Sequence, residues 1–250
     1  MLVVIVLVLL SWLLLRFTIK QPLSVLGYHP AGLRLRQFAI ALLLGILVSS
    51  AVHWTESLVT MSNWKLNPEY SWADFWKASW WNFKSVWFEE LLFRGALLVL
   101  MIHGLGVRWG VVLSSMAFGM YHWFSGGVFG NIPVMIIVFT TTFIMGLVWA
   151  YAYAKTGSIA LAAGSHLGWN GASSILFSDG PNGEQLFVQV TGISYMPLAG
   201  IPSLIFFIAS NAALPLILFF WIKYNIATQS KPSQATSIDS PTPTYESEIS

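Results

Sequence analysis

The stretch FEELLFRG, residues 88–95, places three charged side chains within an otherwise apolar run. The whole chain of 250 residues is 56% hydrophobic and only 9% charged, whereas a soluble globular domain is about 25% charged. A charge at bilayer depth is costly, roughly 2.5 to 3.5 kcal/mol on insertion scales. Glu89, Glu90 and Arg94 therefore have to face one another or a polar cavity inside a helical membrane protein.

Long apolar stretches set the expected fold class. A spanning helix takes about 20 mostly apolar residues. About seven such stretches occur, at roughly 1–19, 35–53, 83–103, 108–124, 131–154, 157–177 and 196–222. They are too long and too continuously apolar for barrel strands of about ten alternating residues. We predict an all-α, polytopic transmembrane helix bundle of about seven to eight spans.

Composition divides the chain into one membrane domain and a tail. The domain covers residues 1–226, with its charged motifs in a core at 83–177, and the polar segment 227–250 has the composition of a disordered tail. A net charge of +2 is too small to indicate a nucleic-acid partner. The absence of cysteine excludes disulfides, thiolate zinc sites and cysteine nucleophiles. The partner that the composition predicts is the lipid bilayer.

Tryptophans and basic residues predict how the bundle sits in the bilayer. Trp72, Trp76 and Trp80 recur every four residues, which is typical of an amphipathic helix lying in the interface, here within 54–82. Basic residues cluster between the first two spans and recur in later loops of the same side: Arg16, Lys20, Arg34, Arg36, Arg108, Lys155 and Lys223. The positive-inside rule assigns that side to the cytoplasm. The short chain and its short loops favour a bacterial plasma membrane as the location of the protein.

Helical geometry separates the two glutamates. Glu90 and Arg94 are four residues apart, so their side chains meet on one helical face. Glu89 is turned about 100° away from that face. Arg94 can neutralise only one carboxylate fully, which leaves Glu89 available as a general acid or base. The alternative is a buried ion pair that only pins helices together.

Two other spans carry polar side chains at comparable depth. His122 ends the string FGMYH, and His166 and Asn170 bound the string HLGWN, four residues apart and so on one face. A single histidine in a span is usually a contact between helices. Here carboxylates and histidines occur on three helices of one small bundle, together with an asparagine in register. This combination predicts a polar cavity that the three helices share.

Hydrolysis is the chemistry that this set of residues supports. Glu89 and His122 can share a water and remove its proton, and His166 and Asn170 can donate hydrogen bonds to an oxyanion, worth about 3 kcal/mol per donor. A metal version is equally compatible with the residues: Glu89, His122 and His166 would hold a divalent ion such as zinc and leave one position for water. The sequence contains no HExxH pair, which disfavours the usual zinc-protease arrangement.

These strings resemble the three motifs of the CPBP family, which comprises CAAX prenyl endopeptidases and bacteriocin-processing or immunity proteins. EELLFR is similar to the family's EExxxR motif, FGMYH to FxxxH and HLGWN to HxxxN, in the same order and on three helices. The resemblance implies an intramembrane endopeptidase that acts on a membrane-associated peptide or protein. By position, Glu89 and His122 would activate water, His166 and Asn170 would form the oxyanion site, and Glu90 and Arg94 would support them.

The family has been described both as metalloproteases and as glutamate-type proteases. Asn170 and the second glutamate make sense as hydrogen-bonding groups, which favours the metal-free mechanism. Two non-protease functions remain open: a proton-coupled transporter, since ionisable groups inside a membrane often relay protons, and a non-catalytic immunity or scaffold protein. A rhomboid-like serine protease is disfavoured because no histidine follows His166, and an aspartyl protease because no aspartate lies within a span.

Overall fold

The computed structural model describes residues 2–177 and 185–226. Its helices are α1 (Leu2–Thr18), α2 (Ala31–Thr60), α3 (Trp72–Phe93), α4 (Ala96–Ser125), α5 (Ile132–Thr156), α6 (Ala160–Gly171) and α7 (Gly200–Asn225). Two short elements complete them, a 3-10 turn η1 (Leu23–Leu26) and a π-helical turn η2 (Ala172–Leu176). The predicted tail at 227–250 lies outside the described residues.

The helices form a membrane bundle. Within the described ranges, four helical stretches are long and apolar enough to cross a bilayer: Leu23–Thr60, Trp72–Ser125, Ile132–Thr156 and Gly200–Asn225. The first helix is also apolar but shorter, at Val4–Thr18. The mostly helical, membrane-integral class is confirmed. The count of seven to eight spans is not confirmed and stays a prediction.

The charged stretch lies at a break between helices. We expected one span over 83–103, and this is wrong because α3 ends at Phe93 and α4 begins at Ala96. A Cβ at Gly95 would lie 2.1 Å from the carbonyl oxygen of Leu91, so only glycine permits this close turn. A second interruption follows at Gly106, where φ is 80°. The break places Arg94 at the end of α3 rather than in the middle of a helix.

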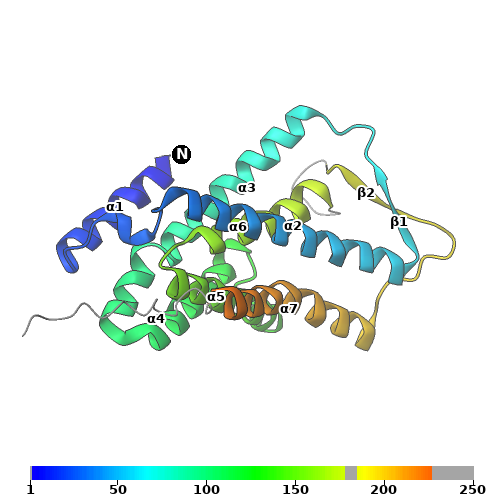
Figure 1. Cartoon of the computed structure of the whole chain (residues 1–250). Helices are drawn as coiled ribbons and strands as arrows, with labels where there is room; N and C mark the ends of the chain where they lie inside the picture. Colours follow the sequence, from blue (N-terminus) through cyan, green and yellow to red (C-terminus); the bar gives the residue numbers. More distant parts are fainter. Residues whose placement is uncertain (1, 178–184, 227–250) are drawn as a thin grey trace, which may run out of the picture.

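A two-stranded sheet departs from the all-α prediction. Met61 has a left-handed φ of 56°, and the chain leaves α2 there as β1 (Ser62–Leu66). This strand pairs antiparallel with β2 (Phe187–Thr191), with Ser62 opposite Thr191 and Leu66 opposite Phe187. The sheet lies at the end of the molecule away from α1 (Figure 1). Because the two strands are far apart along the chain, local periodicity gave no sign of their pairing.

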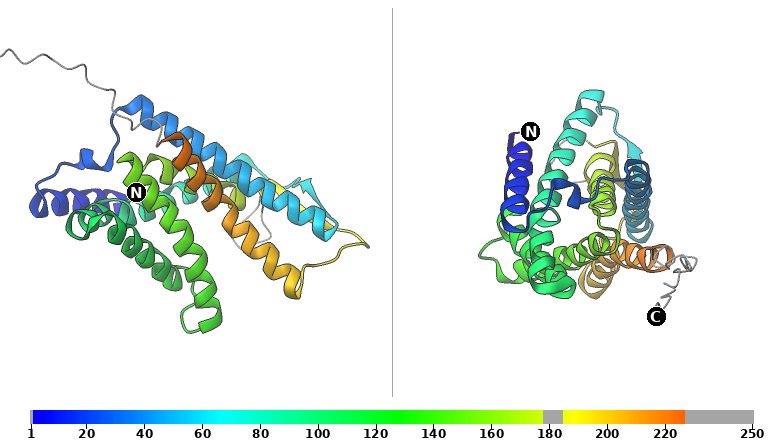
Figure 2. Two further views of the ribbon diagram at one scale, coloured as in Figure 1. Left: turned by 60° about the horizontal axis from the view of Figure 1, so that its bottom comes forward. Right: turned by 60° about the vertical axis from the view of Figure 1, so that its left-hand side comes forward.

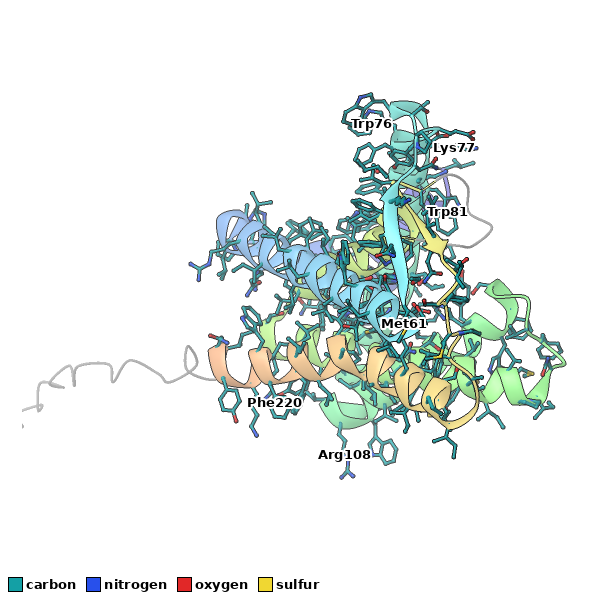
Figure 3. The ribbon with its side chains drawn as sticks, turned by 90° about the vertical axis from the view of Figure 1, so that its right-hand side faces the viewer. Met61, Trp76, Lys77, Trp81, Arg108 and Phe220 are labelled. Carbon is teal, nitrogen blue, oxygen red and sulfur yellow. The ribbon has the colours of Figure 1, made fainter. Side chains whose placement is uncertain are left out.

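The tryptophan-rich segment is the first half of α3. Ser71 and Asp74 form a capping box that begins this helix, a strong start signal. Trp72 and Trp76 are 77% and 66% exposed, and Figure 3 shows Trp76, Lys77 and Trp81 on the part of α3 that rises above the other helices. The shared tryptophan face is therefore present, but a separate interfacial helix over 54–82 is not, because 54–60 belong to α2 and 62–66 to β1.

Close packing of α2 on α6 brings the third motif into the bundle. A Cβ at Gly168 would lie 2.2 Å from the carbonyl oxygen of Leu42, and a Cβ at Gly45 would lie 2.5 Å from that of Ser165. Backbones can approach this closely only through small residues. The same helix α2 also lies beside α7 (Figure 2). The short helix α6 is thereby held between α2, α3 and α5, and the ring of its His166 lies near Phe118 of α4.

Candidate active site

Glu90 is the centre of a buried cluster. Arg94 Nη1 lies 3.2 Å from Glu90 Oε1, as the spacing of four residues predicts. The same oxygen lies 2.8 Å from Nδ1 of His166, on α6. Both Glu90 and Arg94 are 0% exposed. One carboxylate therefore anchors the arginine and orients a histidine from another helix.

Aromatic rings surround the arginine and the histidine. The Arg94 guanidinium carbon lies 4.0 Å from the ring centroid of Phe118 and 5.0 Å from that of Trp149. Trp149 also stacks on His166, with centroids 4.1 Å apart and an interplanar angle of 22°. Its indole Nε1 donates to the hydroxyl of Ser165. These contacts fix both the plane and the depth of the His166 ring.

Glu89 is turned away from this cluster. Ser85 Oγ approaches its Oε1 at 3.5 Å, the upper limit for a hydrogen bond. Its other oxygen, Oε2, is buried and has no hydrogen-bond partner. Oε2 lies 3.6 Å from Nε2 of His166 and 3.9 Å from Nε2 of His122. An orphaned carboxylate oxygen is costly, so this gap between three polar atoms calls for a bridging group such as water.

Hydrogen bonds at the far side of each ring set the tautomers. His122 Nδ1 lies 2.8 Å from the carbonyl oxygen of Phe118, one turn earlier in α4. A carbonyl only accepts, so Nδ1 carries the proton and a neutral His122 presents a lone pair at Nε2. His166 Nδ1 donates in the same way to Glu90. Both histidines thus turn Nε2 toward Glu89.

A cavity of about 460 Å³ collects the predicted residues. Glu89, His122, His166 and Asn170 all line it, although they come from α3, α4 and α6. Glu90 and Arg94 are not in its lining and lie behind it in the protein. The volume falls within the roughly 300–1,000 Å³ of small-molecule and cofactor pockets. The structure therefore brings together the residues that the three strings singled out.

Several cavity residues were not predicted from the sequence. Ser85 lines the cavity and lies four residues before Glu89. Asn82, three residues before Ser85, is not in the cavity lining but continues a polar stripe along the same face of α3 that was present in the sequence. Tyr121, Thr141 and Asn211 also line the cavity. They lie among apolar residues of α4, α5 and α7, where a single hydroxyl or amide does not stand out. The Glu90–His166 contact was missed as well, because spacing within one helix cannot show contacts between helices.

Glu89, His122 and His166 are the residues that would hold a metal ion at this site. Zinc binds nitrogen and oxygen ligands at about 2.0–2.2 Å. In the part of the chain that the structure describes, no group of three or more His, Cys, Asp or Glu side chains is arranged to hold a metal ion. Glu89, His122 and His166 converge pairwise at 3.6 and 3.9 Å through the single oxygen Oε2. Two ligands held tetrahedrally at about 2.0–2.2 Å lie about 3.3–3.6 Å apart, so the 3.6 Å pair fits this spacing and the 3.9 Å pair is slightly wider.

Comparison with known families agrees with the site. Residues 71–172 match the profile described as "Type II CAAX prenyl endopeptidase Rce1-like". The matched segment runs from the N-cap of α3 to the first residue of η2 and includes every residue of the predicted site. Neither a curated protein nor a solved structure matches the chain. Through residues 71–172, the chain is similar to this family of intramembrane CAAX-type endopeptidases.

Proposed function

We propose that this protein is an intramembrane endopeptidase in which Glu89 and His122 activate the attacking water. One observation carries the proposal: Glu89 Oε2, buried and unpaired, faces the Nε2 atoms of two histidines across a cavity. The second glutamate contacts both Arg94 and His166 through its Oε1, while its own Oε2 is buried outside the cavity lining and has no hydrogen-bond partner. The site therefore provides one carboxylate for structure and one for proton transfer.

A water in this gap would be held by two acceptors. Hydrogen bonds of about 2.8 Å to Glu89 Oε2 and His122 Nε2 are compatible with the 3.9 Å between those atoms. Both protons of the water then point at the protein, and its lone pair is free to attack a carbonyl carbon. Glu89 accepts the proton as the carbon–oxygen bond forms, which is general-base catalysis.

The oxyanion side of the site is His166 with Asn170. A proton on Nε2 would make His166 an imidazolium that donates to the developing oxyanion, and its Nδ1–H already donates to Glu90. The Glu90 carboxylate stabilises that positive charge. The Asn170 amide lines the same cavity and supplies a second donor. When the peptide carbon–nitrogen bond breaks, the proton held by Glu89 passes to the leaving amine.

The substrate that suits the cavity has an apolar part in the bilayer. A cleft of about 240 Å³ between α5 and α7, lined by Ile137, Ile144 and Phe207 among others, shares Thr141 and Asn211 with the catalytic cavity. A chain entering between these helices would keep its apolar portion in the cleft and place its backbone at Glu89. We propose a membrane-embedded peptide or protein as substrate, and a bacterial plasma membrane as the location.

We favour the glutamate mechanism over a metal-dependent one. Glu90, His166 and Asn170 all have hydrogen-bonding roles in it. A zinc enzyme built on the same three residues remains the rival mechanism. Sensitivity to a chelator separates the two.

The proposed function is tested with purified full-length protein in liposomes that also hold a library of single-span peptides. Products are identified by mass spectrometry for the wild type, Glu89→Gln and the control Glu69→Gln, whose side chain is exposed. Cleavage by the wild type and the control but not by Glu89→Gln supports the proposal. Proton uptake driven by a solute gradient, with no cleavage, would instead identify a transporter. Cleavage that persists in Glu89→Gln would overturn the assignment of the base.

A further inference from the structure

A second large cavity lies apart from the catalytic one. Its volume is about 550 Å³, and it is lined by residues of α1, η1, the first turns of α2, the second half of α3 and the start of α6. Its walls are mostly apolar, with Val8, Leu23, Phe38, Trp87 and Leu91 among them. In the described structure it shares no lining residue with the catalytic cavity.

The walls of this cavity are held by specific contacts rather than by chance packing. Tyr153, on α5, donates its hydroxyl hydrogen to the carbonyl oxygen of Val25 at 2.7 Å. The backbone N–H of Ile159 donates to the carbonyl oxygen of Leu26 at 3.2 Å. Ser158 donates to the carbonyl oxygen of Gly27. The loop through η1 is thus fixed to the corner between α5 and α6, and the cavity is part of the fold.

Arg34 is the charged side chain in the cavity's lining. Its Nε donates to the carbonyl oxygen of His29 at 3.1 Å, and its Nη1 donates to Gln37 Oε1 at 2.9 Å. Both partners are neutral, and no ion pair to Arg34 occurs among the described residues. The guanidinium is therefore positioned by two hydrogen bonds while its positive charge stays unmatched.

The surrounding sequence strengthens this positive field. Residues 1–55 include Arg16, Lys20, Arg34 and Arg36 and not a single acidic residue. The segment 91–177, which supplies the remaining lining residues apart from Trp87, also has none. Glu89 and Glu90, which lie on α3 between Trp87 and Leu91, do not line this cavity and instead contact His166 and Arg94. A basic residue at the mouth of an apolar pocket between helices fits an anionic lipid headgroup.

We propose that this cavity binds one anionic phospholipid, with an acyl chain along Phe38, Trp87 and Leu91 and the phosphate at Arg34. A free anion would leave the apolar walls without a partner, so it does not account for the whole cavity. The unpaired positive charge of Arg34 favours a lipid of net negative charge over a zwitterionic one. The bound chain would lie against α3 at Trp87 and Leu91, on either side of Glu89 and Glu90 in sequence. This site does not depend on the proposed peptidase activity.

Native mass spectrometry of the purified full-length protein tests the proposal. The protein in detergent is titrated with phosphatidylglycerol and with phosphatidylcholine of the same acyl chains. We expect one phosphatidylglycerol to bind about fivefold more tightly than phosphatidylcholine, and Arg34→Gln to remove about that factor. The control Arg108→Gln, which removes an exposed arginine on α4 (Figure 3), should change affinity by less than about twofold.

Further variants separate the two halves of the site. Ala31 lines the cavity and is exposed, so Ala31→Phe should fill the mouth and weaken both lipids. Arg34→Lys should keep the preference for phosphatidylglycerol. If Arg34→Gln and Arg108→Gln lose equal affinity for phosphatidylglycerol, the preference is a diffuse electrostatic effect, which would overturn the proposal. Displacement of the lipid by inorganic phosphate alone, or unchanged binding in Ala31→Phe, would also overturn it.

Discussion

Replacing Arg94 by methionine should strongly destabilise the protein. Arg94 and Glu90 are both 0% exposed and 3.2 Å apart, and removal of one partner from a buried pair costs about 3–5 kcal/mol. The contact with the Phe118 ring at 4.0 Å is also lost, which adds about 1–2 kcal/mol. Together these losses amount to about 4–7 kcal/mol, a large part of the roughly 5–15 kcal/mol by which a typical folded protein is stable.

A double variant isolates the electrostatic part of this cost. In Arg94→Met with Glu90→Gln, no uncompensated charge remains, and the glutamine oxygen still accepts from His166. We expect the double variant to recover about 2–3 kcal/mol relative to Arg94→Met alone. The exposed control Arg108→Met should stay within about 0.5 kcal/mol of the wild type.

The free energies are measured by reversible unfolding in mixed micelles, followed by tryptophan fluorescence. If Arg94→Met is as stable as Arg108→Met, Arg94 does not neutralise Glu90 in the folded protein. If the double variant is no more stable than the single one, the loss comes from packing and not from an unpaired carboxylate. Either result would refute the account of the cluster.

Three further predictions concern packing and proton transfer. Gly168→Ala should lower the free energy of unfolding by about 1–3 kcal/mol, because the new Cβ would lie 2.2 Å from a backbone oxygen of α2. The control Gly104→Ala, with open space around its Cβ, should not lower it. Equal thermal stability of the two variants would contradict the close packing. Asn82→Leu should lower the free energy of unfolding by about 1–3 kcal/mol in the micelle unfolding assay, because the Asn82 amide donates a hydrogen bond to a backbone oxygen of α6 at 3.3 Å. If this variant is as stable as the wild type, the hydrogen bond does not hold α3 to α6. His122→Phe should keep the folded state but lower the single-turnover cleavage rate by at least about 100-fold; an unchanged rate would remove His122 from the mechanism.

The residues of the candidate site were easier to predict from the sequence than the fold was. Charged and polar side chains inside spans are expensive, so Glu89, Glu90, His122 and His166 stood out against an apolar background. Spacing of four residues was enough to pair Glu90 with Arg94. It could not show that Glu90 also contacts His166, because that contact depends on how α3 packs against α6.

Features that depend on single glycines or on distant partners were harder to predict. The break at Gly95 divides an apolar run that hydropathy reads as continuous, because hydropathy averages over about 19 residues. The pairing of β1 with β2 joins segments on either side of the whole motif region. Ser85 and Asn82 formed a readable polar stripe on α3, whereas Thr141 and Asn211 reach the cavity only through the packing of α5 and α7.

The most direct measurement is the single-turnover cleavage rate of one identified substrate by purified wild type, Glu89→Gln and Glu69→Gln, each with and without a strong chelator. The account predicts that Glu89→Gln loses at least about 100-fold in rate, that Glu69→Gln matches the wild type, and that the chelator changes nothing. Loss of wild-type activity with the chelator and its return with zinc would contradict the glutamate mechanism. Wild-type cleavage by Glu89→Gln would contradict the central claim that this carboxylate activates the water.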